Sequence, residues 1–138
     1  MKFLIMVQGT QALYDAMAGK AADGKTWTQE ELAAMYGHME ALNNDLAERG
    51  EMVDGQGLVE PKQARLVSAE DGVPVVSDGP YGETKEVVVG YWVVDVENID
   101  RAVEIAARAY ECPVPSWLTN PPPLVVHQIQ ESPEATDS

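Results

Sequence analysis

The pattern of apolar and polar positions predicts a chain built from short strands and two longer helices. Short continuous apolar runs that are bounded by turn residues are typical of strands covered on both faces. Such runs occupy residues 3–7, 64–67, 73–76, 87–96 and 124–129. The second and third of these runs flank Glu70-Asp71-Gly72, and this spacing predicts a hairpin.

Two segments carry the three- and four-residue spacing of an amphipathic helix. The first covers residues 28–49, and Thr28 and Glu31 form a capping box at its start. The second covers residues 99–109, and Asn98 is placed to cap it. The predicted apolar stripes consist of Leu32, Met35, Met39, Leu42 and Leu46 on the first helix and of Ile99, Ala102, Val103, Ala106 and Tyr110 on the second.

The remaining segments lack a regular pattern. Residues 9–25 are small and polar and predict a loop in which a short helical turn can form, and residues 55–57 supply glycines for tight backbone. Residues 112–123 contain five prolines, which exclude a regular helix or a central strand. Residues 131–138 are polar and acidic and predict a disordered tail, so we expect one domain over residues 1–130.

The predicted order of elements is strand, helix, hairpin, long strand, helix and strand. This order is the split βαβ arrangement of a ferredoxin-like α+β domain, in which helices cover one face of an antiparallel sheet. Both faces of the longest strand are apolar or aromatic: one carries Val87, Val89, Tyr91 and Val93, and the other carries Val88, Trp92 and Val94. Because neither face suits water, the sequence predicts a homodimer in which two sheets pack face to face.

The composition of the chain argues against several classes of function. The 138 residues carry a net charge of -14, which argues against direct nucleic-acid binding, because a phosphate backbone requires a basic surface. A single cysteine favours the reducing cytoplasm and, with two histidines, excludes a closed structural zinc site. The apolar run at residues 3–7 is too short for a signal-peptide core or a membrane span. The chain has no phosphate-loop, dinucleotide or metal motif, so we expect no cofactor and no metal.

The connector that enters the longest strand, residues 77–90, concentrates reactive side chains. Asp78 precedes a Gly-Pro break, where it either shapes the turn or acts as a base at the mouth of a cleft. Tyr81 either packs or donates a hydrogen bond. Glu83 and Lys85 share a face of an extended segment, which fits an exposed ion pair, while a buried Lys85 would bind a substrate carboxylate or stabilise an enolate.

His38 lies at the boundary of the apolar stripe on the first predicted helix, about 70° from its centre. A histidine at such a boundary can face a cleft and keep one nitrogen in water, and its ordinary pKa of about 6.5 suits acid–base chemistry. The alternative is a half-exposed surface histidine without a chemical role.

Several of these motifs resemble the YCII-related proteins, in particular their DGPF subgroup. The matching segments are Met1–Met6, Ala47–Gly50, Gly55–Leu58, Asp78–Tyr81, Glu83–Glu86, Gly90–Trp92 and Asp95. The resemblance covers residues 1–110 and implies a dimeric α+β barrel. It departs from the family at Tyr81, where the family usually has phenylalanine, and in the longer proline-rich segment at 111–123.

The resemblance also bears on function. The stretch from His38 to Leu42 is similar to a His-Leu-x-x-Leu pattern of the wider family, in which a histidine and an aspartate in a cleft form a proposed catalytic pair. We therefore predict a cofactor-free isomerase, cyclase or lyase, with His38 and Asp78 as catalytic residues. Its small-molecule substrate would be bound by Tyr81, Glu83 and Lys85. The alternative is a non-catalytic ligand-binding module, because relatives of this kind occur beside or joined to sigma factors.

Overall fold

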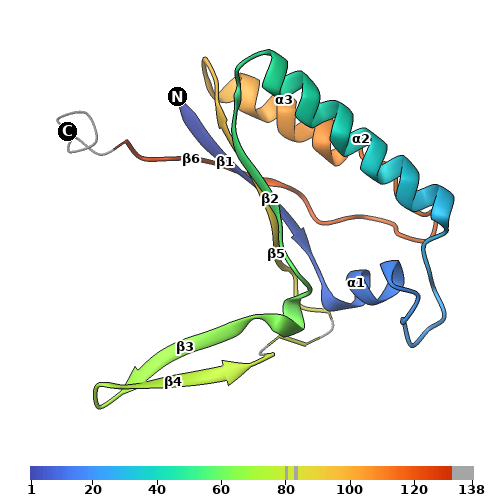
Figure 1. Ribbon diagram of the computed structural model, residues 1–138, viewed down its shortest axis with the longest axis vertical. Helices are drawn as coiled ribbons and strands as arrows, with labels where there is room; N and C mark the ends of the chain where they lie inside the picture. The colour runs from blue at the N-terminus through green and yellow to red at the C-terminus, as the bar shows by residue number, and fades with distance from the viewer. Residues whose placement is uncertain (80, 83, 132–138) are drawn as a thin grey trace.

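The computed structural model describes residues 1–79, 81–82 and 84–131 (Figure 1). Its main sheet has four strands in the order β2-β5-β1-β6, and every neighbouring pair is antiparallel. The strands are β1 (Lys2–Gly9), β2 (Met52–Gly57), β5 (Val87–Asp95) and β6 (Val125–Gln128). The helix α2 (Gln29–Glu48) connects β1 to β2, and α3 (Ile99–Tyr110) connects β5 to β6. Each crossover skips one strand, which confirms the ferredoxin-like α+β fold.

Both long helices begin at the capping residues that the sequence predicts. The Thr28 hydroxyl accepts from the Glu31 backbone N–H at 3.1 Å, and the Glu31 carboxylate accepts from the Thr28 N–H at 2.8 Å. Asn98 accepts from the Arg101 N–H at 3.0 Å. These bonds satisfy backbone donors that lack a partner in the first turn of a helix.

The hydrophobic core lies between the two long helices and one face of the sheet. Alternate residues of β1 and β5 point into it, among them Phe3, Ile5, Trp92 and Val94. Leu42 and Leu46 of α2 and Ala102, Ile105, Ala106 and Ala109 of α3 cover them. The predicted stripe of α3 is therefore partly wrong: Ile99, Val103 and Tyr110 are about half exposed, and Ile105 and Ala109 are buried instead.

Two polar contacts fix the helices on the sheet. The Trp92 indole N–H donates to the Asn43 side-chain oxygen at 2.7 Å, which joins β5 to α2. The Arg101 guanidinium binds the Glu51 carboxylate through two hydrogen bonds of 2.8 and 2.9 Å, which joins α3 to the start of β2. The hydrogen bond from Arg101 lowers the pKa of the Glu51 carboxyl.

The strand β2 was not predicted, and it takes the place in the sheet that the hairpin would otherwise occupy. Its glycines obscure the strand pattern, because glycine has little preference for extended backbone. The structure explains one of them: a Cβ at Gly55 would lie 3.1 Å from the Trp92 ring. Gly55, one of the residues that weaken the strand pattern in the sequence, therefore allows β2 to pack against the buried Trp92.

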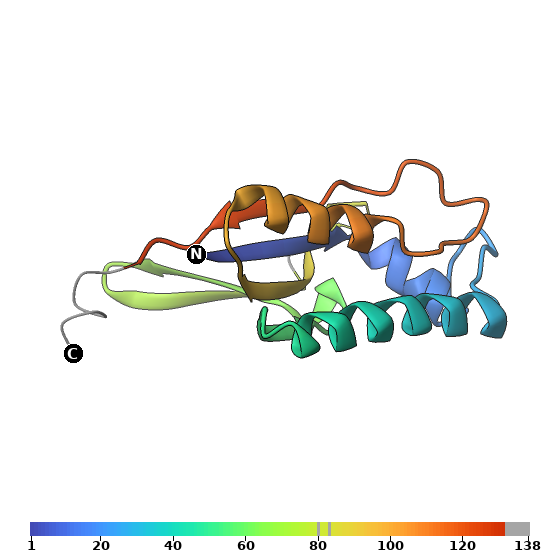
Figure 2. The same ribbon diagram turned by 90° about the horizontal axis from the view of Figure 1, so that it is seen from above.

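The predicted hairpin forms, but it lies outside the main sheet. Its strands β3 (Arg65–Glu70) and β4 (Val73–Asp78) pair only with each other, and every residue in them is exposed. Asp71 and Gly72 at its tip have positive φ angles of 51° and 79°. Figures 1 and 2 show the hairpin projecting away from the sheet and the long helices.

Two further segments lie at the end of the sheet where β1 terminates. The short helix α1 (Gln11–Met17) is capped by Thr10, in a region predicted as loop with a helical turn. The proline-rich segment runs back from α3 to β6 without regular structure, and it is fastened by the Tyr110 hydroxyl to the Pro121 carbonyl at 2.8 Å and by Gln8 to the Pro123 carbonyl at 3.0 Å. In the described part of the chain, no helix has the length and apolarity needed to cross a membrane.

Candidate functional site

His38 joins the two long helices. Its Nε2 lies 2.7 Å from the Arg108 carbonyl oxygen near the end of α3, and because a carbonyl only accepts, this nitrogen carries the proton. Beside it, the Arg108 guanidinium pairs with Asp45 of α2 at 2.6 Å. The half-buried His38 therefore has a structural role that accounts for its position at the edge of the apolar stripe.

Asp78 lies at the base of the projecting hairpin. Its carboxylate is 2.8 Å from Nε of Arg65 on the paired strand, and 77% of the Asp78 side chain is exposed. An ion pair with this exposure contributes about 0–1 kcal/mol. Figure 1 draws the hairpin at the opposite end of the molecule from α2, which carries His38. Within one chain the structure does not bring His38 and Asp78 together, and a shared catalytic role for them stays a prediction.

The connector after Asp78 crosses the short 3₁₀ helix η1 (Pro61–Gln63) at close range. The Gly79 N–H donates to the Ala64 carbonyl at 3.2 Å, and Gly79 has a φ of +52°. A Cβ at this glycine would lie 3.1 Å from the Lys62 carbonyl oxygen. Both the backbone conformation and the contact require glycine here, so this part of the motif has a structural explanation.

Tyr81 lies at a concave surface beyond this crossing. The half-buried Tyr81 lines a cavity of about 460 Å³, which we call the Tyr81 cavity. Its other lining residues are Leu58, Val59, Glu60, Pro61, Gln63, Ala64, Val87 and Val88. Lys85 is exposed and is not among them. Glu83, like Pro80, lies outside the described residues.

A buried amide next to this cavity was not predicted. Gln11 of α1 is 6% exposed, and its side-chain oxygen accepts from the Lys62 backbone N–H at 2.9 Å. This bond fixes the orientation of the amide, so its NH₂ group donates to Asp15 and to Glu60, each at 2.9 Å. The hydrogen bond from Gln11, followed by that from Lys62, lowers the pKa of the Glu60 carboxyl.

Tyr14 fastens α1 to the end of the sheet. Its hydroxyl donates to the Leu58 carbonyl at 2.6 Å and lies 3.4 Å from the Val89 carbonyl. Burial, and to a smaller extent the charge of Glu60, raises the pKa of the Tyr14 phenol. The phenol is therefore neutral and serves as a donor to backbone rather than as a base.

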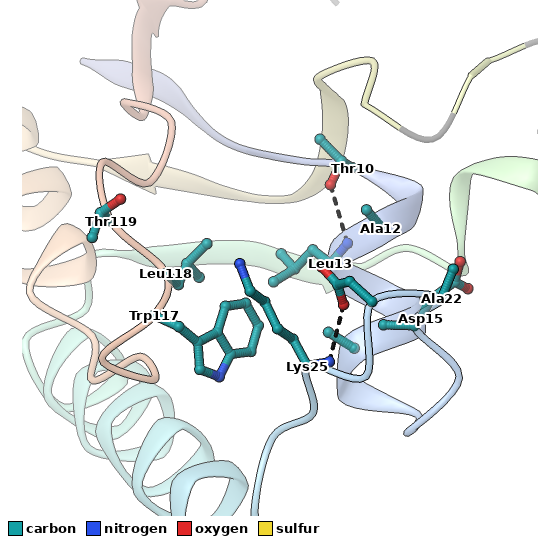
Figure 3. Close-up of a pocket in the computed structure, with 12 residues that line it drawn as sticks. Thr10, Ala12, Leu13, Asp15, Ala22, Lys25, Trp117, Leu118 and Thr119 are labelled. Carbon is teal, nitrogen blue, oxygen red and sulfur yellow. Dashed lines mark hydrogen bonds between the residues drawn. The ribbon is translucent and has the colours of Figure 1, made fainter.

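A second cavity lies on the other side of α1 and has a volume of about 340 Å³ (Figure 3). We call it the Trp117 cavity. Lys25 extends its ammonium to 5.6 Å from the centre of the Trp117 ring, and Leu13 and Leu118 lie beside them. The other lining residues are Thr10, Ala12, Asp15, Ala16, Ala21, Ala22, Asp23 and Thr119.

The two cavities are linked through Gln11. Asp15 lines the Trp117 cavity, Glu60 lines the Tyr81 cavity, and both carboxylates accept from the one Gln11 amide. Sequence reasoning missed Gln11, Asp15, Lys25 and Glu60 because they come from a loop region and from distant segments. Thr10 is the one local signal, since a threonine at this position is typical of a helix start and would have drawn attention to α1.

The fold and these cavities define the chain as a ferredoxin-like α+β protein with concave surfaces at one end of its sheet. A model of the YCII-related domain matches residues 1–113, and the chain therefore belongs to the YCII-related family. The narrower DGPF subgroup stays a prediction.

A relative from Rhizobium meliloti (strain 1021), described as an uncharacterized protein, is 29% identical over 80 residues. That alignment covers 58% of this chain and 64% of the relative, so the chain matches less than two thirds of the relative's length.

Proposed function

We propose that this YCII-related protein binds a small organic molecule in the Trp117 cavity. The observation that carries the proposal is a mainly apolar cavity of about 340 Å³ whose lining residues include three charged ones, Asp15, Asp23 and Lys25. Ligand sites in proteins are usually concave and mainly apolar, and a few polar groups fix the orientation of the ligand. The Trp117 cavity has this composition.

The way the cavity is built supports the proposal. Its walls come from α1, from the loop at residues 21–25 and from residues 117–119 of the proline-rich segment. Four of the lining residues are alanines, and their small side chains leave the space open: they are Ala12, Ala16, Ala21 and Ala22. Segments distant in sequence thus meet around a hollow instead of filling it with larger apolar side chains.

A reaction on the bound molecule is a second candidate function, and Asp15 favours it. One carboxylate oxygen of Asp15, a lining residue of the cavity, accepts from the buried Gln11 amide at 2.9 Å, and this bond fixes the orientation of the carboxylate. A positioned carboxylate can accept a proton from a ligand, and proton transfer of this kind is the basis of cofactor-free isomerase, cyclase and lyase chemistry. In this proposal Asp15 takes the role that sequence analysis assigned to His38 and Asp78.

We also propose a homodimer formed through the helix-free face of the main sheet. Leu4 pairs with Val93 and Met6 with Tyr91 on this face, and all four are half-buried. The Tyr91 hydroxyl donates to Asp54 at 3.3 Å, and partial burial raises the pKa of the Tyr91 phenol. A second sheet would cover this apolar surface.

Sedimentation equilibrium should give a mass near twice 15.0 kDa, and a mass of 15.0 kDa at micromolar concentration would refute the dimer.

The substitution Ala12→Phe tests the binding proposal, because the added ring would occupy the Trp117 cavity. Ligand-detected NMR with a fragment library should find molecules that bind the wild type and fail to bind Ala12→Phe. A ligand at about 100 times its Kd stabilises the protein by about 2.7 kcal/mol, which a thermal shift detects. The control is Ala41→Phe, which adds the same ring at an exposed position of α2 and should retain binding.

The outcomes separate the candidate functions. Fragments that bind Ala12→Phe as well as the wild type would place the site elsewhere and overturn the proposal. If the wild type also converts a bound fragment into a product with new resonances, and Asp15→Asn keeps binding but stops conversion, the protein is an enzyme. Binding without conversion favours the ligand-binding module.

A further inference from the structure

We infer that the Trp117 cavity selects an organic acid, with its carboxylate on Lys25 and a compact apolar body against Trp117. The inference rests on the proposed function of this cavity and names the chemical class of its ligand. Four observations carry it: the Lys25 donors that no described residue occupies, the existing hydrogen bonds of the cavity's carboxylates, the apolar walls, and the charge of the whole chain.

The Lys25 ammonium has hydrogen-bonding capacity that the described residues do not use. An ammonium carries three N–H donors and no acceptor. Within the described ranges no carboxylate lies within ion-pair distance of it, as is also the case for Lys20, whereas Lys62 and Arg65 each pair with one carboxylate and Arg101 with two. The Lys25 ammonium lies over the face of Trp117, and a cation over an aromatic ring is held more weakly than one in a charge-assisted hydrogen bond. An incoming carboxylate would therefore find an ammonium in place at the cavity.

The carboxylates that line the cavity are already engaged from within the protein. One oxygen of Asp15 accepts from the Gln11 amide at 2.9 Å, and one oxygen of Asp23 accepts from the Lys25 backbone N–H at 2.9 Å. The second of these bonds also holds the loop that presents the lysine. Each aspartate thus keeps its negative charge but has a hydrogen-bond donor within the protein, whereas the described residues give the Lys25 ammonium only the face of Trp117.

The walls around this ammonium suit an apolar ligand body. Leu13 of α1 and Leu118 of the proline-rich segment lie on either side of Lys25 and Trp117 (Figure 3). Trp117 is half-buried, it lines the cavity, and its ring lies under the Lys25 ammonium. An acid with a short aliphatic or aromatic body would place its charge on Lys25 and its apolar part on these side chains.

The negative charge of the whole chain means that binding of an acid in this cavity depends on the Lys25 ammonium. With a net charge of -14, the protein as a whole repels anions. A site for an acid in such a protein needs its own positive charge, and in the Trp117 cavity Lys25 supplies it. The same negative charge disfavours the binding of acids at other surfaces of the protein, so an acid should bind selectively at this cavity.

The test compares three probes of similar size: benzoate, benzylamine and benzyl alcohol. The chain has three tryptophans, and Trp117→Phe assigns the Trp117 indole N–H resonance for titrations by two-dimensional NMR. We expect benzoate to move this resonance with an affinity at least about tenfold above that of benzyl alcohol. Lys25→Met should abolish this preference, and Lys25→Arg should restore most of it. Lys20→Met, which removes the same charge at an exposed position outside the cavity, should leave it unchanged.

Each remaining outcome contradicts the inference in a distinct way. If benzylamine or benzyl alcohol binds at Trp117 as tightly as benzoate, the cavity binds ligands but does not select acids, and the proposed function stands without this inference. If benzoate preference survives Lys25→Met, the acid is held by another group. If none of the probes moves the Trp117 resonance while fragments excluded by Ala12→Phe are found, the acid class is wrong. If no such fragments exist either, the proposed function fails as well.

Discussion

Replacing Leu42 with alanine is expected to lower the free energy of unfolding by about 3 kcal/mol. Leu42 lies on the core-facing side of α2 and is 1% exposed, among residues of the sheet and of α3 that are equally enclosed. Removal of its branched end leaves a cavity that rigid neighbours on the sheet cannot fill. Loss of this size is a large part of the about 5–15 kcal/mol that keeps a domain folded. Urea denaturation followed by circular dichroism measures it.

The matched control for this substitution is Tyr36→Ala on the same helix. Tyr36 is 61% exposed, so its removal should change stability by no more than about 0.5 kcal/mol. Equal effects of the two substitutions would mean that the face of α2 assigned to the core is not the face that packs on the sheet.

Replacing Gln11 with leucine is expected to destabilise the protein by about 2 kcal/mol and to loosen both cavities. Leucine has a similar size but no polar atoms, so the Lys62 N–H loses its acceptor and the Asp15 and Glu60 carboxylates lose their shared donor. Gln63→Leu is the control, because Gln63 is exposed and donates to the same Glu60 at 3.3 Å. That change should have an effect below about 0.5 kcal/mol.

The effect of Gln11→Leu should also depend on pH. The Gln11 amide is the main cause that holds the pKa of the Glu60 carboxyl below its ordinary value of 4.5. A lowered pKa in the folded state contributes stability that is present above the unfolded pKa and is lost as the pH falls through the folded pKa. The stability difference between wild type and variant should therefore be largest near neutral pH and should shrink below about pH 4. A constant difference across this range would show that the ionised carboxylate is not what Gln11 stabilises.

The elements with strong local signals were predictable from sequence. The Thr28–Glu31 capping box and the apolar stripe that contains Leu42 identify α2, and the run from Val87 onward identifies β5. These signals depend on neighbours within a few residues, so the sequence displays them directly. β2 was missed because Gly55 and Gly57 carry no side chain to show a pattern, and the position of Gly55 against Trp92 is settled by the packed sheet.

The candidate site was much less accessible to sequence reasoning. Asp78, Tyr81 and Lys85 stand out as reactive residues on one connector, yet the structure pairs Asp78 with Arg65, lines a cavity with Tyr81, and leaves Lys85 exposed. The residues that meet in space come from separate segments, as do Lys25 and Trp117. Nothing in the local pattern around either one indicates the other.

By itself, the sequence determined the two long helices, the principal strands, the hairpin and the alternation that gives a ferredoxin-like sheet, because periodicity, capping and turn residues act over short distances along the chain. Only the tertiary structure decided that the hairpin stands outside the sheet, that β2 completes it, and that Gln11 joins two carboxylates from opposite cavities. These features depend on contacts between segments up to about a hundred residues apart in the chain, such as the 5.6 Å approach of Lys25 to Trp117. Such contacts form only once the chain has folded. The local pattern of apolar and polar residues therefore does not indicate which distant residues will meet.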